Sequence, residues 1–433
     1  MVIHSPSFTV GRRRPARALA EPGGWAHILS NNSASNKLLT IENRLFTERR
    51  IMFYGSGILI AYSFALTWQI LARFVFSQAL ECNLDFCWEW VTGVFAVRDP
   101  AQIFNFSAFS ADELTRLVGP PEEVLRSLKH FLYPPTLLLF LYPLGWMPYF
   151  TAFTVWVVTT LLLYEAAIYA IIPRVAALIA ALTPFVVTEN ILLGHNGFLT
   201  AALIGFSLAF LERRVLLPGI LLGLLTYKPQ FGILFPVALL AARNWRAMVS
   251  AVVASVTFAV AAWIAFGAEG WPTFIRSLLD RNSTLSPVDG YVFVGQSVFG
   301  FLNWMGASSR ISWGIHFSIA AVVVFIVFAV WARPIPYSLK ASILCIGLII
   351  VNPHVQEYDL CILSVGIAFL VKEGLSKGFL AGERAVMLLC VAATFFLTPV
   401  IGPLICAVIL LLILRRIVAC QWMLAPERLD LPI

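Results

Sequence analysis

The sequence predicts an all-α membrane protein with about 12 transmembrane helices and a large first extracytoplasmic loop. Of its 433 residues, 60% are hydrophobic and only 12% are charged, whereas a soluble domain has roughly 25% charged residues. Apolar runs recur from Ile51 to Val418, and many approach the roughly 20 residues that an α-helix needs to cross a bilayer. Short polar breaks separate these runs, which indicates a chain that crosses the membrane many times.

The apolar runs set the expected positions of the spans. Several are shorter than a full crossing, so we expect some of them to be broken, tilted or re-entrant. The segment RVAALIAALTPFVVTEN (174–190) is expected to be re-entrant or interfacial, because a full span there would reverse the orientation of everything that follows. The predicted spans lie at about 51–73, 131–147, 150–171, 195–211, 215–228, 230–242, 247–267, 312–332, 338–352, 359–371, 385–398 and 401–418.

Basic residues give the predicted orientation. Lys and Arg collect on the cytoplasmic side of membrane proteins, and here they occur in short clusters beside the apolar runs: in the arm up to Arg50, and in ERR (212–214), RNWR (243–246), WAR (331–333), KEGLSK (372–377) and LRR (414–416). One topology with both termini inside accommodates all of them. The same clustering explains the net charge of +7 without a nucleic-acid partner, so we exclude nucleic-acid binding.

This topology divides the chain into three parts. Residues 1–50 are expected to be a disordered cytoplasmic arm, because they are polar and contain no removable signal peptide. Residues 51–418 form the transmembrane domain, with extracytoplasmic loops at 74–130 and 267–310, and 419–433 form a cytoplasmic tail. The first large loop contains Cys82 and Cys87, which can form a disulfide in an oxidising compartment.

The stretch TYKPQFG (226–232) places a lysine and a proline between two leucine-rich runs. Since ERR and RNWR both lie inside, the chain between them must cross outward and return, and Lys228-Pro229-Gln230 is predicted to be the bend of a hairpin. Pro229 has no amide proton for an upstream carbonyl, which explains the break. A recessed ammonium at Lys228, with Gln230 beside it, suits a phosphate. The alternative is a lysine that merely extends toward the headgroups at a helix end.

Three more polar clusters are predicted on the same outer face. The first, NLDFCWEW (83–90), spaces Asp85 and Glu89 to share one side of a helix. A carboxylate can take a proton from a sugar hydroxyl as that hydroxyl attacks an activated anomeric carbon, while lysine and polar groups stabilise the departing phosphate. Asp85 is our candidate base, and Glu89 is interpreted as a solvated loop charge.

The other two clusters, ENILLGHNGF (189–198) and NPHVQEYDL (352–360), supply candidates for binding a sugar or an acceptor. His195 can bind sugar, assist the phosphate or cap a helix. His354 with Glu357 and Asp359 could hold a divalent ion, but the spacing matches no strong metal pattern, and we predict no metal and no cofactor. The sugar- or acceptor-binding candidates are His195, Asn196, His354, Tyr358 and Asp359.

Several of these motifs, taken in order, resemble glycosyltransferase family 87, whose members have a GT-C-like fold. The landmarks are Asp85-Phe86 with RDPAQIF, FLYPP with YPLGWMP, GHNGFLTAAL, LLTYKPQFGILFP with RNWR, and NPHVQEYDL, which together cover roughly residues 51–418. Each motif alone is weak, but five in sequence are fairly specific. Two positions depart from the family pattern: His195 stands where the family usually has glutamine, and Thr92-Gly93 replaces an alanine-glycine pair.

The resemblance implies an inverting, metal-independent hexosyltransferase in a bacterial-type plasma membrane. Its donor would be a polyprenyl-phosphate sugar, mannose by default, and its acceptor a lipid or glycan on the extracytoplasmic face. It also implies that the aspartate of the first large loop, here Asp85, is the catalytic base.

A polytopic transporter or lipid flippase is the main alternative, because broken helices with polar residues also occur in carriers. Two features disfavour a carrier: the chain has no visible internal repeat, and its polar groups crowd one predicted face. Glu165, a carboxylate inside an apolar run, is the exception that a transport pathway would explain. A purely structural role ranks third, since it would not require Lys228 within the membrane.

Overall fold

The computed structural model describes residues 33–71, 86–100, 103, 133–214, 216–276, 295–396 and 398–424. These ranges contain helices and no strand, so the predicted all-α class is confirmed for them. The elements are α1 (Ser33–Leu45), α2 (Glu48–Leu71), α3 (Phe86–Arg98), α6 (Thr136–Leu141), η4 (Tyr142–Trp146), α7 (Tyr149–Ile171), α8 (Val175–Leu182), α9 (Phe185–Leu193), α10 (Gly197–Phe210), α11 (Leu217–Leu224), η5 (Leu225–Tyr227), η6 (Pro229–Phe231), α12 (Leu234–Ala241), α13 (Trp245–Phe266), α15 (Val298–Trp304), α16 (Ser309–Trp331), α17 (Tyr337–Val351), η8 (Glu357–Leu360), α18 (Cys361–Lys377), α19 (Glu383–Ala393) and α20 (Ile401–Leu424).

Only some of these helices can cross a bilayer alone. In the described residues five are long and apolar enough: α2, α7, α13, α16 and α20. Helices α8 and α9 are bent by 71° at Thr183-Pro184 and would act together as a broken span or a re-entrant loop. Five further helical segments in this part of the chain are apolar but shorter, with 10–17 residues each. The predicted count of about 12 spans is therefore not confirmed.

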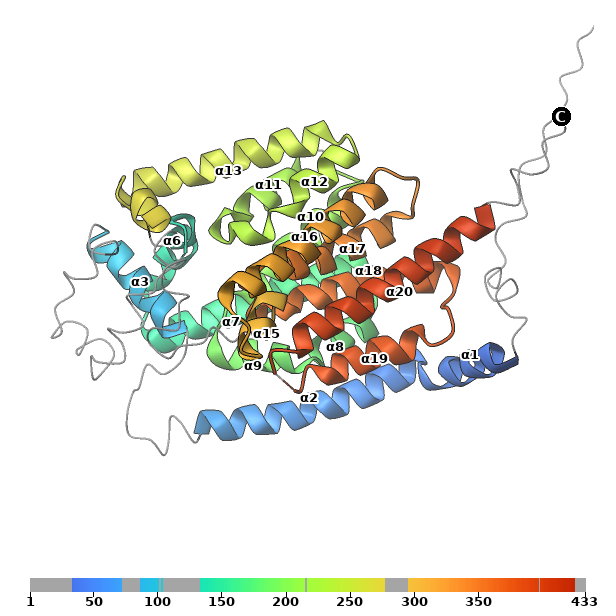
Figure 1. Cartoon of the computed structure of the whole chain (residues 1–433). Helices are drawn as coiled ribbons and strands as arrows, with labels where there is room; N and C mark the ends of the chain where they lie inside the picture. The colour runs from blue at the N-terminus through green and yellow to red at the C-terminus, as the bar shows by residue number, and fades with distance from the viewer. Residues whose placement is uncertain are drawn as a thin grey trace, which may run out of the picture.

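Burial separates the central helices from the peripheral ones. Helices α10, α17 and α18 lie at the centre, and α10 and α17 are buried along most of their length. Helices α2 and α13 run along opposite edges of the bundle (Figure 1) and leave most side chains exposed. The peripheral helices are apolar on all sides, as the central ones are. Since their exposed side chains are apolar, we infer that these side chains face the hydrocarbon of the bilayer.

The basic clusters gather at one end of the bundle. Figure 1 shows the starts of α2 and α13 and the ends of α16 and α20 on the same side, at the right of the view. The buried Arg416 guanidinium pairs there with the Glu383 carboxylate, Nε to Oε1 at 2.8 Å, and its Nη2 donates to the Gly378 carbonyl at 2.7 Å. The shared end is the arrangement that the positive-inside rule demands.

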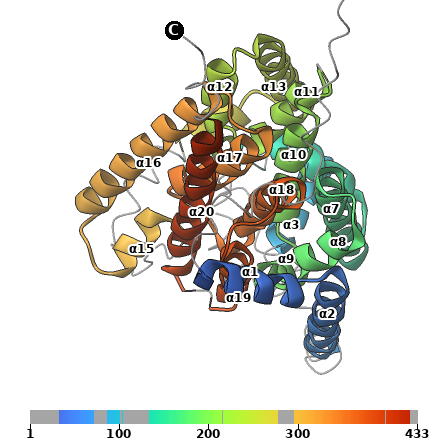
Figure 2. The same cartoon turned by 90° about the vertical axis from the view of Figure 1, so that its right-hand side faces the viewer.

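The structure corrects our expectation for part of the N-terminal arm. From Ser33 on it is not disordered, because α1 lies against α19 (Figure 2). Glu42 of α1 is 1% exposed, and its carboxylate accepts hydrogen bonds from the amides of Gly382 and Ala385 at 3.1 and 3.0 Å. These amides belong to the first turn of α19, where helix N–H groups have no partner within the helix. Glu42 therefore caps α19 from a distant part of the chain.

The two expected extracytoplasmic loops contain helices that pack into the bundle. Helix α3, from the first loop, buries Phe86 and Val91 completely and contacts α6, α7 and η4. Helix α15, from the second loop, buries Phe299. The Gln296 side chain just before α15 accepts from the Gly402 amide at 2.9 Å, which ties this segment to α20. The described parts of these segments are thus part of the folded body.

Candidate functional site

The chain turns back at Lys228, as the sequence predicts. At one end of the 216–244 segment, the carbonyl of Leu216 accepts from Ser250 Oγ of α13 at 2.9 Å. At the other end, the Asn244 side chain caps the N-terminus of the same helix. Between them α11 and α12 are separated by two 3₁₀ turns, and Lys228 has φ −140° and ψ 66°. A residue before proline is displaced from the helical region in this way.

Lys228 lies in the protein interior at this turn. Its side chain is 3% exposed and its partner Asp359 is 0% exposed. The ammonium Nζ lies 2.5 Å from Asp359 Oδ1 and 2.8 Å from Asn196 Oδ1. It also lies 4.5 Å from the centre of the Tyr358 ring. An ammonium has three hydrogens, and the hydrogen bonds of the described residues use two of them.

Asn196 extends this network to α3. Its Nδ2 donates to Glu89 Oε1 and to the Tyr133 hydroxyl, both at 3.0 Å. Glu89 is only 7% exposed, so our interpretation of it as a solvated loop charge is wrong. The reason is that α3 packs into the bundle instead of standing in solvent. We call Glu89, Tyr133, Asn196, Lys228, Tyr358 and Asp359 the polar cluster.

Two glycines place Asn196 at the centre of the polar cluster. Gly194 ends α9 with φ +71°, a conformation that favours glycine, and α10 then begins at Gly197. A Cβ at Gly197 would overlap both the Asn190 side-chain amide and the carbonyl oxygen of Tyr358. The local sequence GHNG therefore lets the start of α10 approach the 352–360 segment closely.

The 352–360 segment supplies the opposite wall. Asp359 Oδ2 accepts from the Gln356 amide at 3.1 Å, so both carboxylate oxygens of Asp359 are engaged. Burial raises the pKa of Tyr358 well above its ordinary value, which keeps its hydroxyl protonated. This hydroxyl lies 3.4 Å from that of Tyr133, and the His195 ring stacks on the Tyr358 ring with centroids 4.0 Å apart.

The structure thus brings together five of the sequence-predicted site residues: His195, Asn196, Lys228, Tyr358 and Asp359. Tyr133 and Glu89 join them without having been predicted. The only signals for these two were the FLYPP motif around Tyr133 and the helical spacing of Glu89 from Asp85. Which charges of a polar segment become buried depends on contacts far along the chain.

The other three predicted residues, Gln230, His354 and Asp85, are not among the side chains that the described contacts bring together. Gln230 is half-buried at the hairpin turn. His354 lies in the same segment as Asp359, and its ring is 6.2 Å from that of Trp313 and 6.3 Å from that of Phe299. Asp85 lies outside the described residues and directly precedes α3.

Two further expectations concern covalent and metal chemistry. Cys87, at the start of α3, is disulfide-bonded, and Cys82 lies outside the described residues. Within the described part of the chain, no group of three or more His, Cys, Asp and Glu side chains could hold a metal ion.

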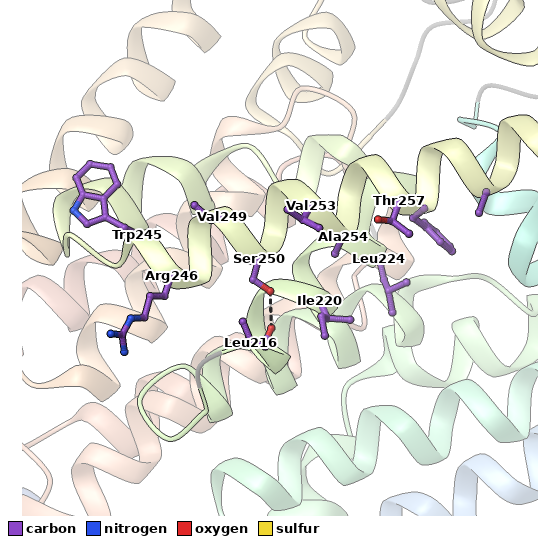
Figure 3. A pocket seen from close by; sticks show the side chains of 12 residues that line it. Leu216, Ile220, Leu224, Trp245, Arg246, Val249, Ser250, Val253, Ala254 and Thr257 are labelled. Atoms are coloured by element: carbon purple, nitrogen blue, oxygen red, sulfur yellow. Dashed lines mark hydrogen bonds between the residues drawn. The ribbon is translucent and has the colours of Figure 1, made fainter.

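An apolar groove of about 850 Å³ lies between α11 and α13 (Figure 3). Its lining contains no residue of the polar cluster, but two aromatic contacts connect its wall to the residue before Lys228. Phe258 of its wall contacts Phe140, which contacts Tyr227 beside Lys228, with ring centroids 5.4 and 5.5 Å apart. The groove begins at Trp245 and Arg246 and continues to Phe258 and Ala261.

The described residues form an α-helical bundle with several helices long and apolar enough to cross a membrane, and the polar cluster is buried among the helix ends. The sequence profile of Glycosyltransferase family 87 matches residues 131–353, just over half of the chain. The chain therefore belongs to glycosyltransferase family 87, as the resemblance of its motifs indicated, and is a membrane glycosyltransferase. No curated protein and no solved structure matches it.

The matched range contains part of the polar cluster. Tyr133, Asn196 and Lys228 lie inside it, whereas Glu89 precedes it and Tyr358 and Asp359 follow it.

Proposed function

We propose that this protein transfers a hexose, mannose by default, from a polyprenyl-phosphate donor to a lipid-linked or envelope glycan acceptor. The transfer takes place on the extracytoplasmic face of a bacterial-type plasma membrane, inverts the anomeric carbon and requires no metal. The observation that carries the proposal is Lys228, a buried ammonium whose hydrogen bonds to the described residues use two of its three hydrogens, with hydroxyl, amide and imidazole side chains around it.

The groove supports a donor with a long lipid chain. A polyprenyl chain is apolar and extended, and the α11–α13 groove is an apolar channel that approaches the hairpin turn. A lipid lying in this groove would place its phosphate near Lys228. Gln230, which follows Pro229 at the same turn, is our second candidate for holding the phosphate.

The proposed reaction needs one base and one anion-binding group. Asp85 takes the proton of the acceptor hydroxyl, and the hydroxyl oxygen attacks the anomeric carbon from the side opposite the phosphate. The bond between the anomeric carbon and the phosphate oxygen breaks, and its electron pair leaves with the polyprenyl phosphate. Lys228 stabilises the charge on this leaving group.

The remaining predicted residues are proposed to bind the sugar or the acceptor. His195 and Tyr358 present a stacked pair of rings beside Lys228, and rings with polar edges bind sugar hydroxyls and apolar sugar faces together. His354 precedes Tyr358 in the 352–360 segment. Asn196 and Asp359 contact Lys228 directly, so their contribution includes holding the ammonium in place.

The proposal is tested with purified protein, a panel of polyprenyl-phosphate sugars and a membrane lipid extract as the source of acceptor. We expect free polyprenyl phosphate to appear together with a glycosylated lipid. One donor sugar of the panel should give more of both products than the others. If no sugar of the panel is consumed, the proposed donor class is wrong.

One observation favours the carrier alternative. Both carboxylate oxygens of Glu165 in α7 are buried without a hydrogen-bond partner in the described structure. Such a group can mark a pathway through the membrane. Proteoliposomes distinguish the two functions, since a carrier moves an intact lipid or solute and breaks no bond.

A further inference from the structure

Glu89 is a buried carboxylate on α3, a helix that other side chains already hold in the bundle. Helix α3 is already held by Phe86, whose ring stacks on Trp156 with centroids 6.3 Å apart, and by Trp90, whose Nε1 donates to the Met147 carbonyl at 3.0 Å. Burying a carboxylate costs free energy that an apolar side chain of the same size would not cost. A glutamate at this position therefore needs a reason beyond the stability of α3.

The donor and acceptor properties of the side chains around Glu89 supply a reason for a carboxylate at this position. A carboxylate only accepts and an ammonium only donates, whereas an amide side chain does both. Glu89 therefore requires Nδ2 of Asn196 to face it, and this leaves Oδ1 to face Lys228, as observed. Asp359 closes the other end of the row. Each member fixes the orientation of the next, so the ammonium has one defined position.

We propose that Glu89 is a positioning residue of the transfer reaction. It fixes the Asn196 amide so that the carbonyl oxygen of this side chain meets Lys228, and the ammonium is thereby held where it binds the donor phosphate. This inference rests on the proposed function, since it assigns to Lys228 the binding of a phosphate. It adds to the site a carboxylate of α3 that accepts a hydrogen bond from the Asn196 side chain.

The test measures binding of undecaprenyl phosphate, the lipid phosphate without a sugar, to purified protein in detergent. Lys228→Ala should weaken binding at least tenfold. Glu89→Leu, which removes the charged one of the two acceptors of the Asn196 amide, should weaken it about tenfold, while Glu89→Gln, which can still accept, should stay within about threefold of wild type. The control is Thr92→Val, because among the described residues the buried Thr92 hydroxyl donates to the Trp88 carbonyl of its own helix, and binding should not change.

A reversed hydrogen bond separates positioning from a structural role. Asn196→Asp places two carboxylates against each other and should weaken binding. Adding Glu89→Gln lets the new amide donate to the new carboxylate, which still accepts from Lys228, so the double variant should bind better than Asn196→Asp alone. This comparison also decides the question if Glu89→Leu fails to fold.

Three results bear on the inference in different ways. If Glu89→Leu binds within twofold of wild type, or if the double variant binds no better than Asn196→Asp, then Glu89 is not a positioning residue. If wild-type protein does not bind undecaprenyl phosphate at all, the proposed function fails as well.

Discussion

The buried pair of Lys228 and Asp359 gives a prediction about stability. The two side chains are 3% and 0% exposed, and their charged atoms lie 2.5 Å apart. Removing one partner of such a pair leaves a buried charge without its counter-charge, which costs about 3–5 kcal/mol. We therefore expect Lys228→Met and Asp359→Asn each to lower the free energy of unfolding by about this amount. The double variant leaves no charge behind and should cost much less than the sum.

The assay is unfolding by sodium dodecyl sulfate in mixed micelles, followed by tryptophan fluorescence. The matched control is the exposed pair of Arg174 and Glu48, whose atoms lie 3.9 Å apart and whose side chains are 51% and 52% exposed. Exposed pairs contribute about 0–1 kcal/mol, so Glu48→Gln should change the free energy of unfolding by no more than that. The reasoning is refuted if either single variant behaves like this control, or if the two single effects add in the double variant.

Three further predictions follow from individual contacts. Gly197→Ala should abolish transferase activity and lower the melting temperature, because the new methyl group would overlap the Tyr358 carbonyl. The control is Gly314→Ala in α16, where nothing lies within 4 Å of a Cβ; it should leave the activity unchanged and the melting temperature unchanged or slightly raised. Equal behaviour of the two variants would contradict the close approach of α10 to Tyr358. Glu42→Ala should lower the free energy of unfolding by about 1 kcal/mol, as loss of a helix cap does, and should speed proteolysis within α1. Cleavage at the wild-type rate would show that Glu42 does not hold α1 against α19. Asp85→Asn should elute as folded protein but lose transfer from a polyprenyl-phosphate sugar, and retained turnover would remove Asp85 from the role of base.

Some features of the site could be predicted because their signals are local. A proline in the interior of an apolar helix breaks or kinks it, so the helix break at Lys228 was predictable from seven residues, and the return of the chain from the basic clusters on either side. The basic clusters also gave the common end of α2, α13, α16 and α20 without any contact information. The GHNG motif marked His195 and Asn196, and these residues contact Tyr358 and Lys228 respectively.

Other features depend on contacts between distant segments. Glu89 and Asn196 are 107 positions apart, and Lys228 and Asp359 are 131 apart, so no local pattern shows that these groups meet. Glu357 and Asp359 stand two residues apart in one polar stretch, yet only Asp359 reaches Lys228. Hydropathy also did not show the two 3₁₀ turns that separate the short helices α11 and α12, so it gave no reliable number of spans.

The sequence by itself determined that this protein is a helical membrane protein, which of its helix ends share a side, and to which family it belongs. These properties follow from the cost of placing charges and unpaired backbone groups in hydrocarbon, a cost that each segment bears independently of the others. Only the tertiary structure decided which charged side chains are buried and which side chains they contact. A buried carboxylate or ammonium is tolerated where a partner from another segment meets it, and that meeting is a property of the packed bundle.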